Sequence, residues 1–246
     1  MDLQVGPVYG PVLSRRLGRS LGINLTPAGR KTCNFSCAYC QYGSTDFPVR
    51  GQWPRSADVI AALDRALAVS NDVDRITVAG NGEPTLHPAF APIVEGLFEI
   101  RARRAPKAKL ALLSNGSTLN RLDVVYSLVH FDERYMKLDA GDATTFRLVN
   151  GPSLPLSRLI ADLRSVGRLT LQSMFVRDAA NVVDNTTPRA IDAWLGAVDQ
   201  IRPECVHLYS VQREPMRSSL RAVPEPVLRE IADRVSALGV RAQVFA

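Results

Sequence analysis

Three of the four cysteines lie within eight residues near the start of the chain. Cys33, Cys37 and Cys40 follow the pattern C-x3-C-x2-C, and Cys205 is far away in the sequence. Three thiolates on a short loop can each bind one iron of a cubane cluster and leave the fourth iron without a protein ligand. Clusters that only transfer electrons usually have four protein thiolates, so an open iron indicates that another molecule binds there.

Zinc is the main alternative, because thiolates also bind zinc well. A structural zinc site needs a fourth Cys or His, and the local loop has none. The histidines are distant, at His87, His130 and His207, although folding could bring one of them close. We expect an iron–sulfur cluster, with zinc or free thiols left open at this point. Cys205 begins an apolar run, and we expect a small buried thiol there.

Short β-rich runs alternate with amphipathic stretches along the chain. Helices are predicted from near Ser56, from Pro88, and over 118–129, 142–149, 155–165, 187–200 and 225–238. Strands are predicted at 21–25, 75–79, 110–113, 134–138, 169–176, 205–211 and 240–245. Nearly continuous apolar strands are typical of a parallel sheet covered by helices. The sequence therefore predicts an α/β fold, a partial (β/α)6-type barrel with a mainly parallel sheet and helices outside.

Length and composition favour one domain. The chain has 246 residues and 46% hydrophobic content, which is enough for one sizeable core. We expect a single domain over 1–246, with 1–20 as an N-terminal extension and 21–55 as the first strand and the cluster loop. The sequence has no run of about 18 apolar residues, so we expect no membrane span. The N-terminus does not resemble a signal peptide. We expect a cytoplasmic protein with no membrane partner.

The net charge of +6 is unevenly distributed. Residues 1–55 contain seven basic and two acidic side chains, a surplus of five positive charges. Such a segment could attract an anionic substrate, a nucleic acid or an acidic redox partner. A solvated basic surface explains the same charges equally well.

Polar motifs follow the predicted strands, where a parallel barrel places its ligand-binding residues. The second strand ends in Asn81-Gly82-Glu83, the third in Ser114-Asn115-Gly116, and the fourth contains Lys137 followed by Asp139. Lys137 and Asp139 alternate with apolar residues, so both lie on one side of their strand. Ordinary turns and a structural ion pair remain alternatives for these motifs.

The cysteine loop, with an aromatic residue before its last cysteine, resembles the signature of the radical S-adenosylmethionine (SAM) superfamily. The resemblance implies that Cys33, Cys37 and Cys40 hold a [4Fe-4S] cluster. It also implies that SAM chelates the fourth iron through its methionyl amine and carboxylate. Tyr39 occupies the position that lies against the adenine in that family.

The strand-end motifs extend this resemblance. Asn81-Gly82-Glu83 is similar to a Gly-Gly-Glu motif that receives the methionyl amine, and Asn best tolerates the left-handed backbone that glycine allows. Ser114 and Asn115 resemble a Thr-Asn-Gly whose side chains contact SAM. Lys137 and Asp139 could reach the SAM ribose or carboxylate. Weaker candidates are Gln172 and Tyr209 for the cofactor and Arg213 for the substrate.

More narrowly, the segments around Gly6-Pro7-Val8 and Gln41-Tyr42-Gly43 resemble short iron–sulfur oxidoreductases related to the wyosine-base-forming enzymes of tRNA modification. The resemblance implies an enzyme that cleaves SAM reductively to a 5′-deoxyadenosyl radical for hydrogen abstraction. An RNA base or another anionic molecule is the expected substrate, although a small molecule or a peptide stays open. The expected electron donor is a flavodoxin or ferredoxin. A glycyl-radical activase and a non-catalytic Fe-S or zinc protein are the alternatives.

Overall fold

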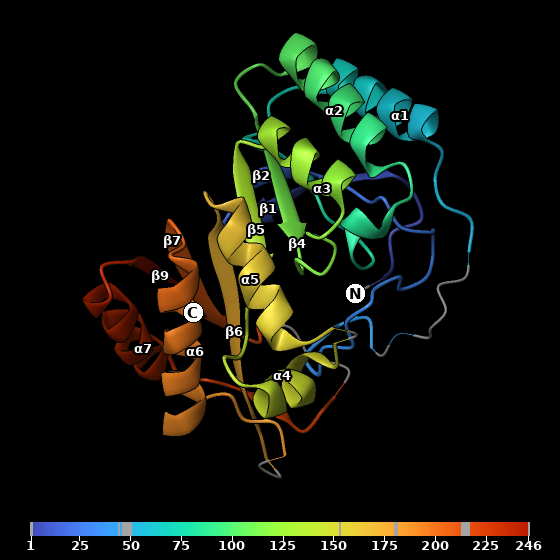
Figure 1. The fold of residues 1–246 in the computed structure, drawn as a ribbon. Helices are drawn as coiled ribbons and strands as arrows, with labels where there is room; N and C mark the ends of the chain where they lie inside the picture. The colour runs from blue at the N-terminus through green and yellow to red at the C-terminus, as the bar shows by residue number, and fades with distance from the viewer. Residues whose placement is uncertain are drawn as a thin grey trace. The chain divides into compact units, whose positions relative to one another are not determined.

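A computed structural model describes residues 2–43, 45, 51–152, 154–179, 182–212 and 217–245 (Figure 1). The chain divides into two compact units. The first comprises Met1–Cys33, Asp46–Ser114 and Thr118–Arg134, and the second comprises Asn34–Thr45, Asn115–Ser117 and Tyr135–Ala246. Each unit contains a mainly parallel sheet with helices packed on it. The expectation of one domain over 1–246 stays a prediction.

The sheet of the first unit has a parallel core and one antiparallel edge strand. Its strands are β1 (Val8–Ser14), β2 (Gly18–Ile23), β3 (Arg75–Val78) and β4 (Lys109–Ser114). β2, β3 and β4 pair in parallel, and β1 runs antiparallel to β2.

The assignment of 1–20 as an extension missed β1 entirely, and β2 begins at Gly18 rather than at Leu21. Gly10-Pro11 interrupts the first strand and reads as a turn in the sequence. The pairing of β1 with β2 brings Tyr9 close to Gly22, two residues that the sequence pattern did not connect. A Cβ at Gly22 would lie 2.1 Å from the ring of Tyr9, so only glycine leaves room for this ring.

Two long helices of the first unit pack side by side (Figure 1). They are α1 (Ser56–Val69) and α2 (Phe90–Arg104). Each helix buries one apolar stripe, although Ile60 of α1 is only half-buried. α1 begins at Ser56, as predicted, but Arg55 and not Ser56 is its N-cap residue, so the reading of Ser56 as a plausible N-cap from its residue type is wrong. α3 (Leu122–Ser127) is shorter than predicted, since a 3-10 turn over Leu128–His130 replaces its last turn.

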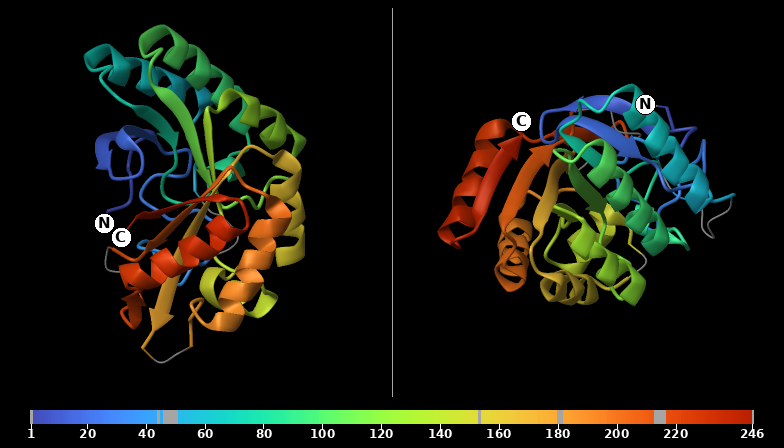
Figure 2. Two further views of the ribbon diagram at one scale, coloured as in Figure 1. Left: turned by 90° about the vertical axis from the view of Figure 1, so that its left-hand side faces the viewer. Right: turned by 90° about the horizontal axis from the view of Figure 1, so that it is seen from above.

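The second unit contains the remaining strands and helices. β5 (Glu133–Lys137), β6 (Thr170–Asp178), β7 (Cys205–Ser210) and β9 (Arg241–Phe245) pair in parallel in that order. In its described residues the helices are α4 (Ala143–Asn150), α5 (Leu156–Val166), α6 (Pro188–Ile201) and α7 (Glu225–Ala237). In Figure 2, α6 (orange) and α7 (red) cover the same face of this sheet.

The predicted alternation of strands and helices is confirmed. Besides β1, the sequence pattern missed the short strand β8 (Leu220–Ala222), which pairs antiparallel with the end of β6. Three residues are too few to show a period of two. Over the described ranges, no helix combines the length and the apolar character that crossing a membrane requires.

Candidate functional site

The chain that leads into the cysteine loop is bound to the turn after β3. The backbone N–H of Thr32 donates to the carbonyl of Asn81 over 3.0 Å, and the N–H of Glu83 donates to the carbonyl of Thr32 over 2.9 Å. A Cβ on Gly82 would lie 1.8 Å from the oxygen of Thr32. Glycine at 82 is therefore required by this bridge, which fixes the backbone next to Cys33 in the first unit.

Asn81 anchors the N-terminal segment instead of adopting a glycine-like backbone. The only non-glycine residues with positive φ in the described ranges are Arg168 and Arg202, so the expected left-handed conformation of Asn81 is wrong. The Asn81 side chain is fully buried, accepts from the N–H of Gln4 over 2.7 Å and donates to the Gln4 carbonyl over 2.8 Å. A side-chain role in holding the chain thus explains why Asn stands here.

Glu83 is the centre of a buried hydroxyl network. Its side chain is almost completely buried, and Oε1 accepts from the N–H of Thr85 over 3.1 Å, from Thr85 Oγ1 over 2.5 Å and from Ser114 Oγ over 2.7 Å. The first of these bonds caps the 3-10 turn Pro84–Leu86. Thr118 then donates to Thr85 through their hydroxyl groups. The structure thus brings together two predicted site residues, Glu83 and Ser114, from the ends of different strands.

The resemblance to radical SAM proteins predicts that Glu83 receives the methionyl amine of SAM. On that prediction we expect the substitution Glu83→Gln to weaken SAM binding by about tenfold, because a charge-assisted contact to the amine would be lost. The melting temperature should change little, since the amide oxygen still accepts the bonds from Thr85 and Ser114. Calorimetric titration of the reconstituted protein with SAM measures the affinity. Ser127→Ala is the matched control, because it removes one buried hydroxyl of α3, which donates to the Asp123 carbonyl, costs about 1 kcal/mol of stability and should leave SAM affinity unchanged. Unchanged SAM affinity in Glu83→Gln would count against a role of this carboxylate in binding.

In the second unit, the cysteine loop rests on the end of α4. The N–H of Ser36 donates to the carbonyl of Asn150 over 2.9 Å, and the N–H of Ala38 donates to the carbonyl of Val149 over 2.8 Å. Asn150 Nδ2 donates to Cys37 Sγ over 3.4 Å. Sequence reasoning missed Asn150, because Asn followed by Gly151 at a helix end is explained by backbone geometry alone. Gly151 indeed has a positive φ of 49°.

Tyr39, Lys137 and Asp139 form one charged cluster beside this loop. Tyr39 donates its hydroxyl hydrogen to Asp139 Oδ2, and Lys137 Nζ donates to Tyr39 Oη over 2.7 Å. Lys137 Nζ lies 3.6 Å from Asp139 Oδ2, so the two residues form the ion pair that the sequence left open. Burial, and next the negative charge of Asp139, hold the pKa of Tyr39 well above its ordinary value.

Asp139 is fully buried and heavily bonded. In addition to the hydrogen bond from Tyr39, its carboxylate accepts from Asn150 Nδ2 over 2.6 Å and from the N–H of Met174 over 2.8 Å. The carboxylate therefore connects the cysteine loop, α4 and β6 within the second unit.

The donor set fits an iron–sulfur cluster. Cys33, Cys37 and Cys40 are half-buried, and none of them forms a disulfide within the described part of the chain. Loss of water around Cys37 raises the pKa of its thiol, and the charge of Lys137 lowers it in part. The amide of Asn150 is placed to stabilise a thiolate at Cys37. Cys33 belongs to the first unit and the other two to the second, and in neither unit do three potential ligands converge among the described residues.

A second network involves the residue after Cys33. Asn34 Nδ2 donates to Ser117 Oγ over 2.7 Å, and Asn115 Nδ2 donates to Asn34 Oδ1 over 2.9 Å. Asn115 also accepts from the N–H of Ser117 over 2.9 Å. Asn115 was a predicted site residue, whereas Asn34 and Ser117 were not, because neither matches a motif position.

The weaker candidates are less closely connected. Gln172 on β6 lies between Lys137 of β5 and His207 of β7 in register, and its buried Nε2 has no hydrogen-bond partner among the described residues. Tyr209 lies opposite Met174 and is largely buried. Arg213 lies outside the described residues.

Cys205 and two of the histidines are buried in packing roles. Cys205 is only 1% exposed at the start of β7, and burial raises the pKa of its thiol. His87 accepts from the N–H of Ala89 over 3.0 Å, and its other ring nitrogen contacts the Pro54 carbonyl over 2.9 Å. His207 packs against the rings of Tyr135 and Phe245.

Comparison with known families gives the identity of this arrangement. The family described as the radical SAM superfamily matches residues 31–161, more than half of the chain. The chain belongs to the radical SAM superfamily. The matched segment of this radical SAM protein contains the three cysteines, Glu83, Ser114 and Asp139. A [4Fe-4S] cluster and SAM are therefore its cofactors.

Curated relatives place the radical SAM protein more narrowly. It is 31% identical to a UPF0026 protein, slr1464 of Synechocystis, over 95% of its own length and 82% of the relative, so it also belongs to the UPF0026 proteins. It is 30% identical to a protein of Brachyspira hyodysenteriae named GTPase Obg, over 90% of its own length but only 32% of that protein. It spans about half the length of other UPF0026 relatives, 58% and 46% of two from Helicobacter pylori.

Solved structures confirm the predicted fold class, a mainly parallel α/β radical SAM core. A radical SAM methyltransferase of Sphaerobacter thermophilus matches with a TM-score of 0.67 and 15% identity, over 92% of this chain and 65% of that chain. TYW1, solved with a lysine-pyruvate adduct, matches with a TM-score of 0.62 and 14% identity, over 90% of this chain and 75% of that chain. At these identities the similarity concerns the fold alone.

Proposed function

We propose that this radical SAM protein is an enzyme that abstracts hydrogen from an anionic substrate, and that an RNA base is the best candidate. The C-x3-C-x2-C loop carries the proposal, because its three cysteines lie in the segment that matches the superfamily and form no disulfide among the described residues. A cluster that serves only electron transfer would have a fourth protein thiolate, and Cys205 is buried in β7.

The chain's own residues would bind and orient the cofactors. Cys33, Cys37 and Cys40 would hold the cluster, and Asn150 would donate to the Cys37 sulfur. When bound, the cluster and SAM supply a one-electron cleavage that yields methionine and a 5′-deoxyadenosyl radical. Glu83 would receive the methionyl amine, and the backbone at Gly82 would approach it closely.

The other residues that the sequence analysis assigned to SAM keep those roles in this proposal. Tyr39 would lie against the adenine. Two hydrogen bonds orient its ring, because its hydroxyl accepts from Lys137 and donates to Asp139. The other proposed cofactor contacts are Asn81 through its backbone, Ser114, Asn115, Lys137, Asp139, Gln172 and Tyr209. Arg213 is kept as a proposed substrate contact.

Two observations support an anionic substrate. Residues 1–55 carry seven basic and two acidic side chains, and a basic segment raises the local concentration of polyanions. The fold similarity to TYW1 agrees with the proposed kinship to wyosine-related enzymes. A flavodoxin or ferredoxin is the proposed electron donor, since both are acidic one-electron carriers.

The decisive experiment is anaerobic. The protein is reconstituted with iron and sulfide, reduced with dithionite and given SAM with and without total RNA. We expect 5′-deoxyadenosine, more of it when the substrate is present, measured by liquid chromatography. A fully formed cluster that produces none under either condition would reject the enzyme. Zinc as the native metal would favour the metal-binding alternative.

A further inference from the structure

Asn150 is the last residue of α4, and its side chain is fully buried. Its amide nitrogen, Nδ2, donates to Asp139 Oδ2 over 2.6 Å and to Cys37 Sγ over 3.4 Å. Its amide oxygen, Oδ1, has no hydrogen-bond partner in the part of the chain that the structure describes. An asparagine amide has two N–H donors and one acceptor oxygen. At this position the donors are therefore used and the acceptor is not.

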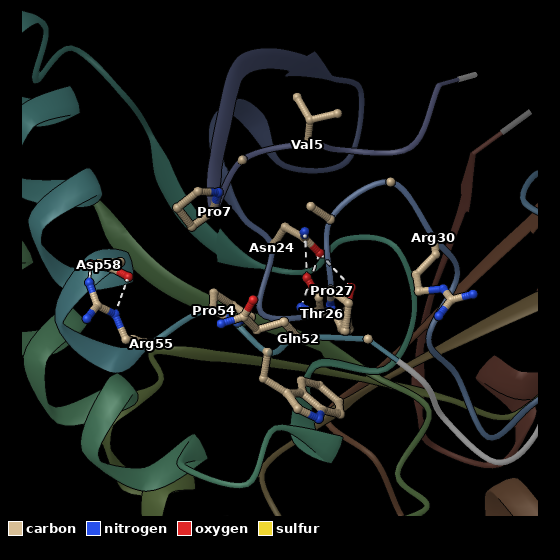
Figure 3. Close-up of a pocket in the computed structure, with 15 residues that line it drawn as sticks. Val5, Pro7, Asn24, Thr26, Pro27, Arg30, Gln52, Pro54, Arg55 and Asp58 are labelled. Atoms are coloured by element: carbon tan, nitrogen blue, oxygen red, sulfur yellow. Dashed lines mark hydrogen bonds and ion pairs between the residues drawn. The ribbon is translucent and has the colours of Figure 1, made fainter.

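Asn150 differs from the other buried asparagines of the described residues, which bond both ends of their amides. Figure 3 shows one of them, Asn24, whose oxygen accepts from the N–H and the hydroxyl of Thr26 and whose nitrogen donates to the Thr26 carbonyl. The others are Asn81, Asn115 and Asn185. A buried acceptor without a donor costs free energy of folding. The fold keeps this cost at position 150, which indicates that the nitrogen of this amide has a role.

Asp139 determines which end of the Asn150 amide faces Cys37. Carboxylate oxygens accept hydrogen bonds, so the amide nitrogen must face Asp139 Oδ2. An amide turned the other way would bring two acceptor oxygens together. Asp139 is itself fixed to β6, because the N–H of Met174 donates to its other oxygen over 2.8 Å. The N–H group that meets the Cys37 sulfur is therefore held in place by a carboxylate that is held in place by the sheet.

A hydrogen bond to the Cys37 sulfur affects the charge that this sulfur carries as a cluster ligand. Reduction brings one electron from the reductant into the cluster, so the cluster and its thiolates become more negative by one charge. An N–H group that points at a thiolate stabilises the more negative state more strongly, and it therefore raises the reduction potential. Cys37 is half-buried, and a hydrogen bond away from bulk water is electrostatically stronger than one in water.

We propose that Asn150 is a positioning residue that acts through Cys37: its hydrogen bond, oriented by Asp139, raises the potential at which the cluster accepts an electron. This inference rests on the proposed function, since a radical SAM enzyme needs the reduced cluster to cleave SAM. It deepens that function by assigning control of the electron uptake to a residue that is not itself a ligand.

The test is a redox titration of the reconstituted protein with dithionite, without SAM, in which electron paramagnetic resonance measures the reduced cluster. We expect Asn150→Ala to lower the ratio of reduced to oxidised cluster about tenfold at a fixed potential, because the sulfur loses its donor. For one electron this factor corresponds to a shift of the midpoint potential by about −59 mV. Asn150→Leu, which fills the volume of the amide without a donor, should shift the potential by a similar amount.

Asn185→Ala and Asn185→Leu are the matched controls. Asn185 is a buried asparagine of the same unit, which accepts from the N–H of Val176 and donates to the carbonyls of Asp139 and Met174. These bonds reach no sulfur, so both controls should keep the wild-type potential. The melting temperature without the cluster should fall in Asn185→Ala as it does in Asn150→Ala, whereas the potential should change only in Asn150→Ala.

Two results would overturn the proposal. One is a midpoint potential of Asn150→Ala and Asn150→Leu equal to that of the wild type. The other is loss of iron from both Asn150 variants but not from the Asn185 variants, because Asn150 would then be needed to build the site and not to tune it.

SAM cleavage by the wild type is scored in a separate assay. Cleavage combined with unchanged potentials in the Asn150 variants rejects this inference and keeps the enzyme. A shifted potential in these variants, without any 5′-deoxyadenosine from the wild type, keeps the inference and rejects the enzyme.

Discussion

Cys37→Ala is expected to abolish the formation of 5′-deoxyadenosine from SAM. The two cysteines that remain in the loop are too few ligands to hold a cubane cluster, so iron incorporation should fall as well. The variant should still fold, because Cys37 is half-buried on a loop and contributes one weak hydrogen bond from Asn150. Iron content, the visible absorbance of the reconstituted protein and the product after dithionite reduction measure the effect.

Cys205→Ala is the control for this substitution. This variant also loses one cysteine thiol, but at a site inside β7 where the side chain is only 1% exposed. We expect wild-type iron content and product from it, at a cost of about 1 kcal/mol for the small cavity. Full SAM cleavage by Cys37→Ala would show that the loop does not hold the catalytic cluster. Loss of iron in Cys205→Ala would show that the fourth cysteine is a ligand.

Local periodicity was sufficient to predict most of the elements. The apolar stripe of α2, from Phe90 to Ile100, repeats with the helical period and is buried as expected. The strands that are buried on both faces read as continuous apolar runs, such as Leu110 to Leu112 in β4. Because parallel strands end at the same edge of a sheet, the sequence also indicated that Glu83 and Ser114 would lie close together. Their hydrogen bond of 2.7 Å confirms this.

The features that the sequence missed depend on contacts between distant residues. β1 pairs with β2 where the ring of Tyr9 lies over Gly22, and neither residue indicates the other in the sequence. Asn81 bonds Gln4, which is 77 residues away, so its role was misread as a backbone preference. Asn150 meets Cys37 across 113 residues, and a helix-end Asn gives no sign of a thiol partner. Such pairings follow from register and topology, which periodicity does not fix.

Asp139→Ala is expected to destabilise the protein by about 3–5 kcal/mol, because it removes one partner from a buried ion pair. Asp139 is fully buried, and its loss leaves three groups without their acceptor: the amide of Asn150, the N–H of Met174 and the hydroxyl of Tyr39. Lys137 loses its counter-charge at 3.6 Å. The melting temperature should fall by roughly 10 °C, measured by thermal unfolding without the cluster.

Two further variants separate charge from bonding at this site. Asp139→Asn keeps the shape, but its NH2 group must face a donor, because Met174 donates to one carboxylate oxygen and Asn150 to the other. We therefore expect Asp139→Asn to be destabilised as well. Asp142→Ala is the control: it removes the nearby N-cap of α4, whose oxygen accepts from Thr144 and Thr145, at a cost of about 1 kcal/mol. Equal stability of Asp139→Asn and the wild type would contradict this account. In that case the carboxylate would be retained for its charge toward the cofactor, because the fold would not need it to connect the cysteine loop with β6.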